Sequence, residues 1–370
     1  MSGPSTLNDI NRLGIAFAEA KVVLAAVELG LFTRLGAGPA TRDELCAALG
    51  LHPRAARDFL TALTCTGLVH HEDGKYAASP AADTYLDKTK PTYGGAFLER
   101  ANRMMYPAWE NLSGLLRTGE PQLAGREDQA AAFEKMMGNP DHLRNFLRMM
   151  DAVSGPLAPE LATKFDWSAH RTVLDVGGAR GNLLAQVLKA HPHLTGTVFD
   201  LPPIEPMFDE HIAGFGLTDR ARFAGGDAFT TELPAADVVV TGHVLHDWGP
   251  AERTELVRRM ARAVNPGGAL LIYDMLLEPA PADPWNTLIS LNMQLLSPGG
   301  SEYTLAECEE YLAAAGLSDV DTVRLGDHDT LVIARKPAGG QHRVELFAAQ
   351  PVVQRDQGYP GAGRGEERDR

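Results

Sequence analysis

Side chains that could bind or move a proton follow short apolar segments in the second half of the chain. His246 and Asp247 come after the apolar run that begins at Asp237, and Asp274 ends the next such run. A histidine titrates at about 6.5 and is an available base at neutral pH, whereas a phenol titrates at about 10 and is a poor nucleophile until its proton is removed. A base placed on such a hydroxyl contributes roughly 10²–10⁴ in rate. His246 is therefore a candidate general base, with a hydrogen-bonded structural histidine as the alternative.

Two carboxylates could support this histidine. A carboxylate on the far ring nitrogen would fix the tautomer of the base and stabilise its imidazolium form. Asp274 is one candidate, and Glu302, which follows the turn at residues 298–301, is the other. The residues alone leave the choice between them open. The same histidine and acids could instead ligate a metal, but their spacing is not that of a metal site, so none is predicted.

The segment from Thr172 to Asp200 predicts a strand, a glycine-rich turn, a helix and a second strand. A short apolar run is followed by Gly177, Gly178 and Gly181, and then by apolar residues at helical spacing. Glycines allow a tight turn with positive φ and a close approach of a ligand to the backbone. Asp200 at the tip of the second strand suits a ribose diol, because a carboxylate accepts two O–H bonds.

The spacing of this loop does not fit a dinucleotide. A Gly-x-Gly-x-x-Gly pattern would need glycine at positions that hold Ala179 and Asn182. Asp175, just before the turn, adds a negative charge that would repel a pyrophosphate. S-adenosylmethionine (SAM) instead offers adenosine to Asp200, an ammonium group to the acidic loop, and no phosphate. SAM is therefore the predicted cofactor, and a glycine-rich turn in an unrelated α/β protein is the alternative.

Strands and helices alternate from Thr172 onwards. Beyond the first two strands, strands are expected at 222–227, 237–240 (continuing to Leu245), 269–274, 320–325 and 330–334, with helices at 251–264 and 304–315. This order predicts an α/β protein with a doubly wound, mainly parallel sheet and one antiparallel addition. Ligands of such sheets bind beyond the carboxyl ends of the strands. Asp200, Asp227, His246, Asp247 and Asp274 are predicted to lie there, and Glu302 could reach the same edge.

The first ninety residues predict three helical segments and a hairpin, which is the order of a winged helix. A capping box at Thr41 and Glu44 begins one helix, and Pro53 begins the next. Asp73-Gly74 suits a tight turn between two short strands. A winged helix can bind DNA, but the basic residues here are balanced by acidic ones, namely Arg54, Arg57 and Lys75 against Asp58, Glu72 and Asp73. A dimerisation and scaffolding role is therefore favoured.

Composition narrows the class of protein. The 370 residues suffice for two domains, and 44% hydrophobic with 22% charged residues is ordinary for a globular chain. A net charge of −14 disfavours nucleic acid or an anionic membrane as the main partner. The longest apolar run, Val22 to Val27, is too short to span a bilayer, and no signal-peptide pattern is seen. Cys46, Cys65 and Cys308 are expected to be reduced, half-buried residues. Together these features predict a cytoplasmic protein.

Five motifs occur in order: residues 173–181 (Val-Leu-Asp-Val-Gly-Gly-Ala-Arg-Gly), 199–202 (Phe-Asp-Leu-Pro), 225–227 (Gly-Gly-Asp), 245–248 (Leu-His-Asp-Trp) and 298–302 (Pro-Gly-Gly-Ser-Glu). With them the chain, from Leu13 to Lys336, resembles the SAM-dependent small-molecule O-methyltransferases of the caffeate and acetylserotonin type. That family has bacterial relatives in aromatic polyketide tailoring. The combination of His-Asp-Trp with Pro-Gly-Gly-x-Glu is specific, whereas the glycine loop alone is not.

The resemblance implies a domain order. It implies a winged-helix-like dimerisation domain over residues 1–90, helical linker and substrate-pocket helices over 91–168, and a SAM-binding, Rossmann-like catalytic domain over 169–336. From residue 337 the composition turns to Gly, Gln, Arg and Glu, so a disordered tail is expected over 337–370. A homodimer in which the partners help to close each other's pockets is also implied.

The resemblance also carries roles to individual residues. Gly177 would touch SAM, Asp200 would bind the ribose hydroxyls, Asp227 would meet the adenine amino group, and His246 matches the family's base. Glu302 matches a supporting carboxylate. The full set of predicted cofactor-binding residues is Asp175, Gly177, Gly178, Gly181, Asp200, Leu201, Asp227, Ala228, Phe229 and Gly242. The predicted acceptor-binding residues are Met105, Trp109, Phe146, Met150, Asp247 and Met293, whose thioethers and rings suit a flat apolar ligand.

Four positions depart from the family pattern. Ala179 replaces a usual glycine, and Ala228 stands where a larger adenine-stacking residue is common, so Phe229 would have to substitute. Gly242 lies where plant members often carry lysine. Asp274 is one methylene shorter than the usual glutamate, which affects its reach toward the base.

The predicted function is SAM-dependent methylation of a phenolic hydroxyl on an aromatic small molecule, in secondary metabolism. One alternative is methylation at nitrogen or carbon of a related molecule. Another, of a different class, is a winged-helix regulator with a vestigial ligand-sensing domain. The balanced charge of the winged helix and the presence of His246 argue against the regulator.

Overall fold

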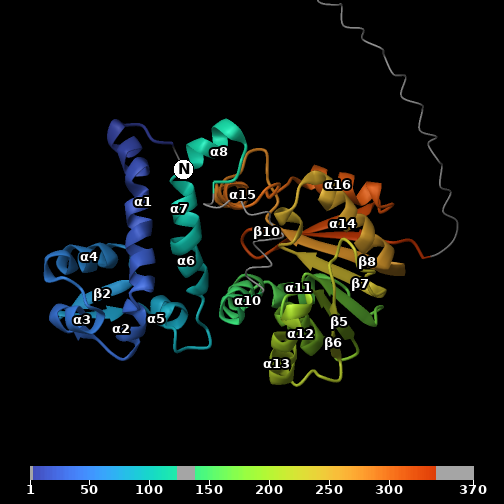
Figure 1. Cartoon of the computed structure of the whole chain (residues 1–370), viewed down its shortest axis with the longest axis horizontal. Helices are drawn as coiled ribbons and strands as arrows, with labels where there is room; N and C mark the ends of the chain where they lie inside the picture. Colours follow the sequence, from blue (N-terminus) through green and yellow to red (C-terminus); the bar gives the residue numbers. More distant parts are fainter. Residues whose placement is uncertain (1–2, 123–137, 339–370) are drawn as a thin grey trace, which may run out of the picture. The chain divides into compact units, whose positions relative to one another are not determined.

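A computed structural model describes residues 3–122 and 138–338 of the chain (Figure 1). The tail predicted over 337–370 therefore lies outside the described residues, apart from its first two. Within the described part, no helix is both long enough and apolar enough to cross a bilayer.

The N-terminal part contains helices and a small sheet in the predicted order. Its elements are α1 (Leu7–Glu28), α2 (Leu31–Gly36), β1 (Ala40–Thr41), α3 (Arg42–Leu49), α4 (Pro53–Cys65), β2 (Val69–Glu72), β3 (Lys75–Ala78) and α5 (Pro80–Leu86). The three strands lie in the order β1-β3-β2. The predicted capping box of α3 is present, with Thr41 and Glu44 each bonding the other's backbone N–H. Cys65 is exposed, contrary to the prediction, because it ends α4 on the face away from the apolar core.

Helices follow between this part and the large sheet. They are α6 (Ala96–Arg100), the π-helical turn η1 (Ala101–Met105), α7 (Tyr106–Trp109), α8 (Leu112–Thr118), α10 (Pro140–Ser154) and α11 (Ala158–Lys164). Asn139 caps α10 by accepting from the N–H groups of Asp141 and His142. A π-helical turn adds a residue to a helical turn and is frequent at functional sites. The predicted acceptor residue Met105 lies in this turn.

The remainder is a seven-stranded sheet with the order β6-β5-β4-β7-β8-β10-β9. Its strands are β4 (Thr172–Val176), β5 (Thr195–Asp200), β6 (Ala221–Gly225), β7 (Ala236–Gly242), β8 (Val264–Asp274), β9 (Asp319–Leu325) and β10 (Asp329–Arg335). All neighbours from β6 to β8 are parallel, and β10 is antiparallel to both β8 and β9. The predicted doubly wound, mainly parallel sheet with one antiparallel addition is confirmed.

Helices cover both faces of this sheet (Figure 1). The helices of this half are α12 (Asn182–Ala190), α13 (Glu205–Phe215), α14 (Pro250–Ala263), α15 (Trp285–Leu296) and α16 (Leu305–Ala314). Successive strand residues point to opposite faces, so Val238 and Val240 pack with α11, α12 and α13, whereas Val239 packs with α14 and α16. Burial on both faces explains why these strands read as continuous apolar runs.

Strand β7 ends earlier than the sequence predicted. The expectation that it continues to Leu245 is wrong, because the strand stops at Gly242. His243 has φ +53°, which lies outside the strand region and is uncommon for a residue with a Cβ. Leu245–Asp247 then form a 3₁₀ turn, η3. This break turns His246 out of the sheet.

Candidate active site

The glycine loop after β4 is built around residues that cannot carry a side chain. Gly177 has φ +74°, and a Cβ there would lie 2.4 Å from Cγ2 of Val244. A Cβ on Gly178 would lie 2.5 Å from Oδ2 of Asp175. Ala179, the departure from the family pattern, takes φ +52° in spite of its methyl group. The loop therefore keeps bare backbone beside a buried carboxylate.

Asp175 is the negative group of this loop and is only 3% exposed. Its Oδ2 has no hydrogen-bond partner among the described residues. Burial, with the negative charge of Asp200 in addition, raises the pKa of Asp175 to about 7. A buried carboxylate oxygen without a partner fits a cationic ligand such as the ammonium group of SAM.

Asp200 at the end of β5 is held by two backbone donors. Its Oδ2 accepts from the N–H of Ala179 at 2.8 Å, and its Oδ1 accepts from the N–H of Leu201 at 2.7 Å. Burial raises its pKa to about 6, although both hydrogen bonds act in the opposite direction. A carboxylate has about four acceptor sites, so Asp200 retains capacity for two hydroxyl donors.

The turn after β6 holds the predicted adenine-binding residues. Asp227 is exposed, and its Oδ1 accepts from the N–H of Phe229 at 2.8 Å. The ring of Phe229 contacts the edge of Trp248 at a centroid distance of 4.6 Å. Arg259 of α14 donates to the carbonyl of Ala228 at 2.6 Å. Phe229, rather than Ala228, supplies the aromatic surface of this turn.

At Gly242, which ends β7, the ring of another residue occupies the space that a side chain would need. A Cβ on Gly242 would lie 2.0 Å from the ring of Tyr273 on β8. A longer side chain at this position, such as the lysine common in plant members, would require Tyr273 to move. The buried Tyr273 ring thus takes the place of a side chain at Gly242.

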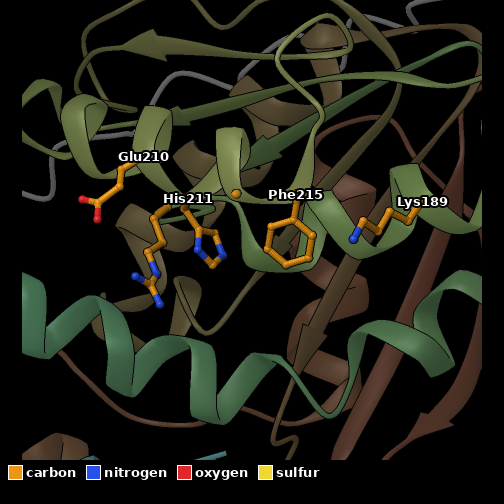
Figure 2. A pocket seen from close by; sticks show the side chains of 6 residues that line it. Lys189, Glu210, His211 and Phe215 are labelled. Carbon is orange, nitrogen blue, oxygen red and sulfur yellow. The ribbon is translucent and has the colours of Figure 1, made fainter. Parts of the chain in front are cut away.

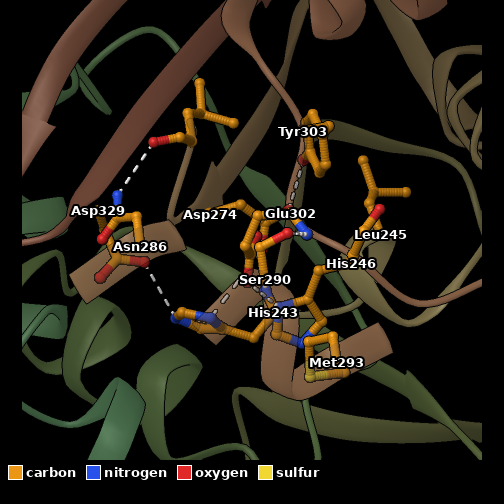
Figure 3. Close-up of polar contacts among 12 residues, drawn as sticks. His243, Leu245, His246, Asp274, Asn286, Ser290, Met293, Glu302, Tyr303 and Asp329 are labelled. Atoms are coloured by element: carbon orange, nitrogen blue, oxygen red, sulfur yellow. Dashed lines mark hydrogen bonds and ion pairs between the residues drawn. The ribbon is translucent and has the colours of Figure 1, made fainter. Parts of the chain in front are cut away.

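His246 and Glu302 form a direct contact (Figure 3). Nδ1 of His246 lies 2.7 Å from Oε1 of Glu302, whose side chain is fully buried. Burial alone would lower the pKa of His246, but the carboxylates of Glu302, Asp247 and Asp274, with Glu302 contributing most among them, together raise it to about 10. With Nδ1 directed to the carboxylate, Nε2 is the nitrogen left for a proton from a substrate.

Asp274, the other candidate support, is engaged elsewhere. Its Oδ1 accepts from the backbone N–H of His243 at 2.7 Å, and its Oδ2 accepts from the hydroxyl of Tyr303. It is fully buried, which raises its pKa to about 6. The structure thus brings Glu302, and not Asp274, into hydrogen-bond contact with the ring of His246.

Arg253 of α14 connects the two loops that carry this pair. Its Nε donates to the carbonyl of Leu245 at 3.0 Å, and its Nη2 donates to Oγ of Ser301 at 2.8 Å. Ser301 in turn donates its N–H to the carbonyl of His246 at 2.9 Å. Arg253 is 1% exposed, and its guanidinium lies over the ring of Tyr303.

Sequence reasoning missed Arg253, although a signal was present. Leu256, Val257 and Met260 are buried residues of α14 and follow Arg253 by three, four and seven positions. This spacing places Arg253 on the same face of the helix. An arginine on the apolar face of a helix is buried unless it snorkels, and a buried arginine needs acceptors. His243 and Asp329, which also lie near His246, were not predicted either.

The predicted acceptor residues lie on η1 and α7, on α10, on α15 and in η3. Nε1 of Trp109 donates to Oδ1 of Asn292 on α15 at 3.3 Å, and the neighbouring Met293 lies beside the ring of His246 (Figure 3). Met105 and Met150 are half-buried. Phe146 packs in a cluster that includes Ala179 and Leu201 of the predicted cofactor site, and so lies on the cofactor side.

Two further charged pairs surround this region. Arg180 of the glycine loop donates its Nε to Oδ2 of Asp151 on α10 at 2.6 Å, which ties the loop to the helix of Met150. Burial lowers the pKa of Arg100 on α6, while the charge of Asp247 acts to raise it. Asp247 therefore faces a cation from the helical segment rather than open solvent.

A hollow lies on α12 and α13, and His246 is not among the residues that line it (Figure 2). Its charged side chains are engaged with neighbours. Arg180 pairs with Asp151, Glu210 with Arg144, and Lys189 lies 4.5 Å from the centre of the Phe215 ring. We therefore place the chemistry at the carboxyl edge of the sheet and not in this hollow.

His243, His246 and Asp274 also form a group whose ligand atoms lie within 4.8 Å of one another. Both oxygens of Asp274 already accept hydrogen bonds, and Nδ1 of His246 faces Glu302. These contacts describe a hydrogen-bonded network, and they leave few free lone pairs for a metal ion.

Comparison with known proteins decides the family. The O-methyltransferase domain model matches residues 109–318, more than half of the chain, and the O-methyltransferase dimerisation domain model matches residues 12–88. The chain belongs to the O-methyltransferase family. The predicted resemblance, enzyme class and cofactor are confirmed, and this methyltransferase uses SAM.

Individual relatives of this methyltransferase cover nearly its whole described length. It is 45% identical over 331 residues to the tetracenomycin polyketide synthesis 8-O-methyltransferase TcmO of Streptomyces glaucescens, covering 89% of this chain and 96% of that one. It is 38% identical over 329 residues to the N,N-dimethyltransferase OxyT of Streptomyces rimosus, covering 88% and 95%. The structure of human N-acetylserotonin methyltransferase in complex with SAM matches with a TM-score of 0.81 at 26% identity, covering 91% and 100%.

Proposed function

We propose that this SAM-dependent methyltransferase methylates a phenolic hydroxyl of an aromatic small molecule, with His246 as general base and Glu302 as its support. The 2.7 Å contact between His246 and Glu302 carries the proposal. It fixes the tautomer in which Nε2 is free to accept a proton. It also raises the pKa of His246 toward that of a phenol, about 10, so that proton transfer between the two is nearly balanced.

The reaction then needs one proton transfer and one displacement. Nε2 of His246 takes the phenolic proton while the oxygen forms a bond to the methyl carbon. SAM, when bound, would supply the electrophilic methyl group, and the bonding electrons of the broken C–S bond would remain on its sulfur as a neutral thioether. His246 returns its proton to solvent, and Glu302 stabilises the imidazolium in the interval. Most of the remaining acceleration comes from holding oxygen, methyl carbon and sulfur in line.

We assign the cofactor contacts by the same geometry. Asp175, with its unpartnered Oδ2, faces the ammonium group of SAM, and Asp200 takes the ribose hydroxyls. Asp227 and the ring of Phe229 take the adenine, while Gly177, Gly178 and Gly181 provide bare backbone. Leu201, Ala228 and Gly242 are proposed to border the cofactor at the same edge, and a Cβ on Gly242 would lie 2.0 Å from the ring of Tyr273.

The acceptor site is proposed from α7, α10 and α15. Trp109, Met150 and Met293 offer aromatic and thioether surface to a flat ring, with Met105, Phe146 and Asp247 at its margins. By their names, TcmO is an 8-O-methyltransferase of tetracenomycin polyketide synthesis, and a relative from Streptomyces sahachiroi is a 3-O-methyltransferase of 3-hydroxy-5-methyl-1-naphthoate. Their similarity to this chain supports an aromatic acceptor and a place in secondary metabolism.

We further propose a homodimer assembled through the N-terminal domain. Helix α1 exposes large apolar side chains, namely Leu7, Ile10, Leu13, Ile15 and Phe17. Exposed apolar surface of this kind marks a protein interface, and the matched dimerisation model covers α1 from residue 12. A cytoplasmic location, with no nucleic acid or membrane as partner, remains the proposal drawn from composition.

The position of the transferred methyl group tests the function. Hydroxylated polycyclic aromatics would be incubated with SAM carrying a ¹³C methyl group, and the products analysed by NMR. An O–¹³CH₃ signal on a phenolic oxygen is the expected result. OxyT supports nitrogen as a second candidate, so aminated analogues belong in the panel. Transfer only to nitrogen or carbon, or a salt-dependent complex with DNA without any transfer, would contradict the proposal.

A further inference from the structure

His243 lies three residues before His246, at the point where β7 ends (Figure 3). It has φ +53°, a conformation that costs energy for a residue with a Cβ. Its backbone N–H donates to Oδ1 of Asp274 at 2.7 Å and lies 3.3 Å from the carbonyl of Tyr273. The backbone turn that directs His246 out of the sheet is therefore held by the fully buried Asp274.

Both ring nitrogens of His243 face carboxylates. Nε2 lies 3.1 Å from Oδ1 of Asp329 on β10, and Nδ1 lies 4.0 Å from Oδ1 of Asp274 on β8. Nε2 and Oδ1 of Asp329 lie within ion-pair distance, and neither has another hydrogen-bond partner among the described residues. A neutral imidazole donates from one nitrogen only, whereas an imidazolium donates from both. The positions of the two carboxylates fit the charged ring.

This ring is close to the proposed base. The centroids of His243 and His246 are 5.7 Å apart; His243 is buried, and His246 is half-buried. The charged or titratable groups around His243 come from three elements: Asp329 on β10, Asp274 and Tyr273 on β8, and His246 and Asp247 in η3. A positive charge so near opposes a second positive charge on the neighbouring ring.

We propose that His243 is a positioning residue, whose imidazolium, held between Asp329 and Asp274, fixes the turn that carries His246 and makes it easier for His246 to lose its proton. The negative charge of Glu302 favours the protonated form of His246, and the positive charge of His243 opposes it. His246 therefore returns more readily to its neutral form after each turnover. This inference rests on the proposed role of His246 as general base.

Burial alone would lower the pKa of His243, but the carboxylates of Asp329 and Asp274 together raise it, as expected for a buried imidazolium. A histidine that merely fills space would have no effect on the protonation of His246. A positioning histidine with a charge changes the pH at which the base becomes available. The pH profile therefore separates the two roles.

The first test compares His243→Asn with the wild type. Asparagine tolerates positive φ and retains an amide donor for Asp329, but carries no charge. We expect the acid limb of kcat/KM to move to higher pH by about one unit, with turnover at pH 7 lower by about tenfold. Turnover on the high-pH plateau falls less. A uniform loss at every pH, or a limb that stays or moves to lower pH, would overturn the proposal.

A second measurement does not depend on that variant folding. The wild-type and Asp329→Asn proteins would be labelled with ¹⁵N-histidine and titrated by NMR. His243 is expected to carry protons on both nitrogens at pH 7 in the wild type and to lose one in Asp329→Asn. A neutral His243 at pH 7 in the wild type would overturn the inference. Retention of full turnover by His246→Ala would instead overturn the proposed function, so the two failures are distinguishable.

Discussion

The imidazole of His246 and the carboxylate of Glu302 meet at 2.7 Å although 56 residues separate them in the chain. His246 lies in the 3₁₀ turn that follows the end of β7 at Gly242, and Glu302 lies in the turn before α16. Arg253 binds the carbonyl of Leu245 and the hydroxyl of Ser301, which are the residues immediately before each member of the pair. The pair is therefore positioned by a buried cation that touches neither side chain.

Replacing Glu302 by glutamine tests its effect on the base. Glu302 raises the pKa of His246, so without the charge the ring loses its proton at lower pH. The acid limb of kcat/KM is expected to move to lower pH, while the plateau falls by about 10- to 100-fold because the base is weaker and less well oriented. A limb that stays in place would show that Glu302 does not act on His246.

Removal of Arg253 tests the connection between the two loops. In Arg253→Met the carbonyl of Leu245 and the hydroxyl of Ser301 lose their donor, so the pair is less well held. We expect kcat to fall by about tenfold or more, with the affinity for SAM unchanged. Arg258→Met on the same helix is the matched control, since Arg258 pairs with Glu255 at the surface. Equal losses in both variants would contradict the role given to Arg253.

Asp175 links the stability of the free protein to cofactor binding. Its pKa is raised to about 7, so the neutral form is favoured by folding, and stability falls as pH rises from about 4 through 7. Asp175→Asn removes this loss, so without SAM at pH 8 its melting temperature is expected to be higher than that of the wild type, and its free energy of unfolding larger by no more than about 4 kcal/mol. Calorimetry should show SAM binding weakened at least about tenfold. Unchanged SAM affinity would refute the ammonium contact.

The glycine loop offers a steric test. In Gly178→Ala the new methyl group would lie 2.5 Å from Oδ2 of Asp175, so the carboxylate must move. SAM affinity is expected to fall by about tenfold or more. Gly214→Ala in α13 is the control, because nothing lies within 4 Å of its Cβ position. If calorimetry gives the same SAM affinity for Gly178→Ala and the control, the loop does not bind the cofactor as proposed.

The exposed face of α1 should determine the oligomeric state. Leu13 and Phe17 are 65% and 59% exposed in the single chain, and glutamate at both positions would place charges in the proposed interface. Light scattering is expected to show a dimer for the wild type and a monomer for the double variant. Leu116→Glu, at a residue 70% exposed on α8, is the control and should remain dimeric. A monomeric wild type would remove the basis of the homodimer.

The sequence predicted the sheet because its strands are buried on both faces and its helices carry regular start and stop signals. Thr41, Pro53 and Thr304 all act as the helix-start residues that their types indicate. The end of β7 could not be predicted, because an apolar run gives no sign that His243 adopts positive φ. That conformation depends on Asp274, 31 residues later in the chain.

Much of the candidate site followed from residue types at strand ends, but its partner choices did not. Asp274 and Glu302 were equivalent as supports in the sequence. The structure separates them, since Tyr303 and the backbone of His243 occupy Asp274. Asp329 reaches His243 only because the antiparallel β10 pairs with β8, where Thr330 lies opposite Asp274. Such contacts arise from strand register, which local patterns do not encode.

The most direct test of the central claim is chemical rescue of His246→Ala. The rate of methyl transfer to a phenolic acceptor would be measured with saturating SAM, without and with added imidazole, alongside the affinity for SAM. The account predicts a loss of roughly 10²–10⁴ in rate, partial recovery with imidazole as its neutral form increases, and SAM affinity within about twofold of the wild type. Wild-type turnover by His246→Ala, with SAM bound normally, would contradict the assignment of His246 as the base.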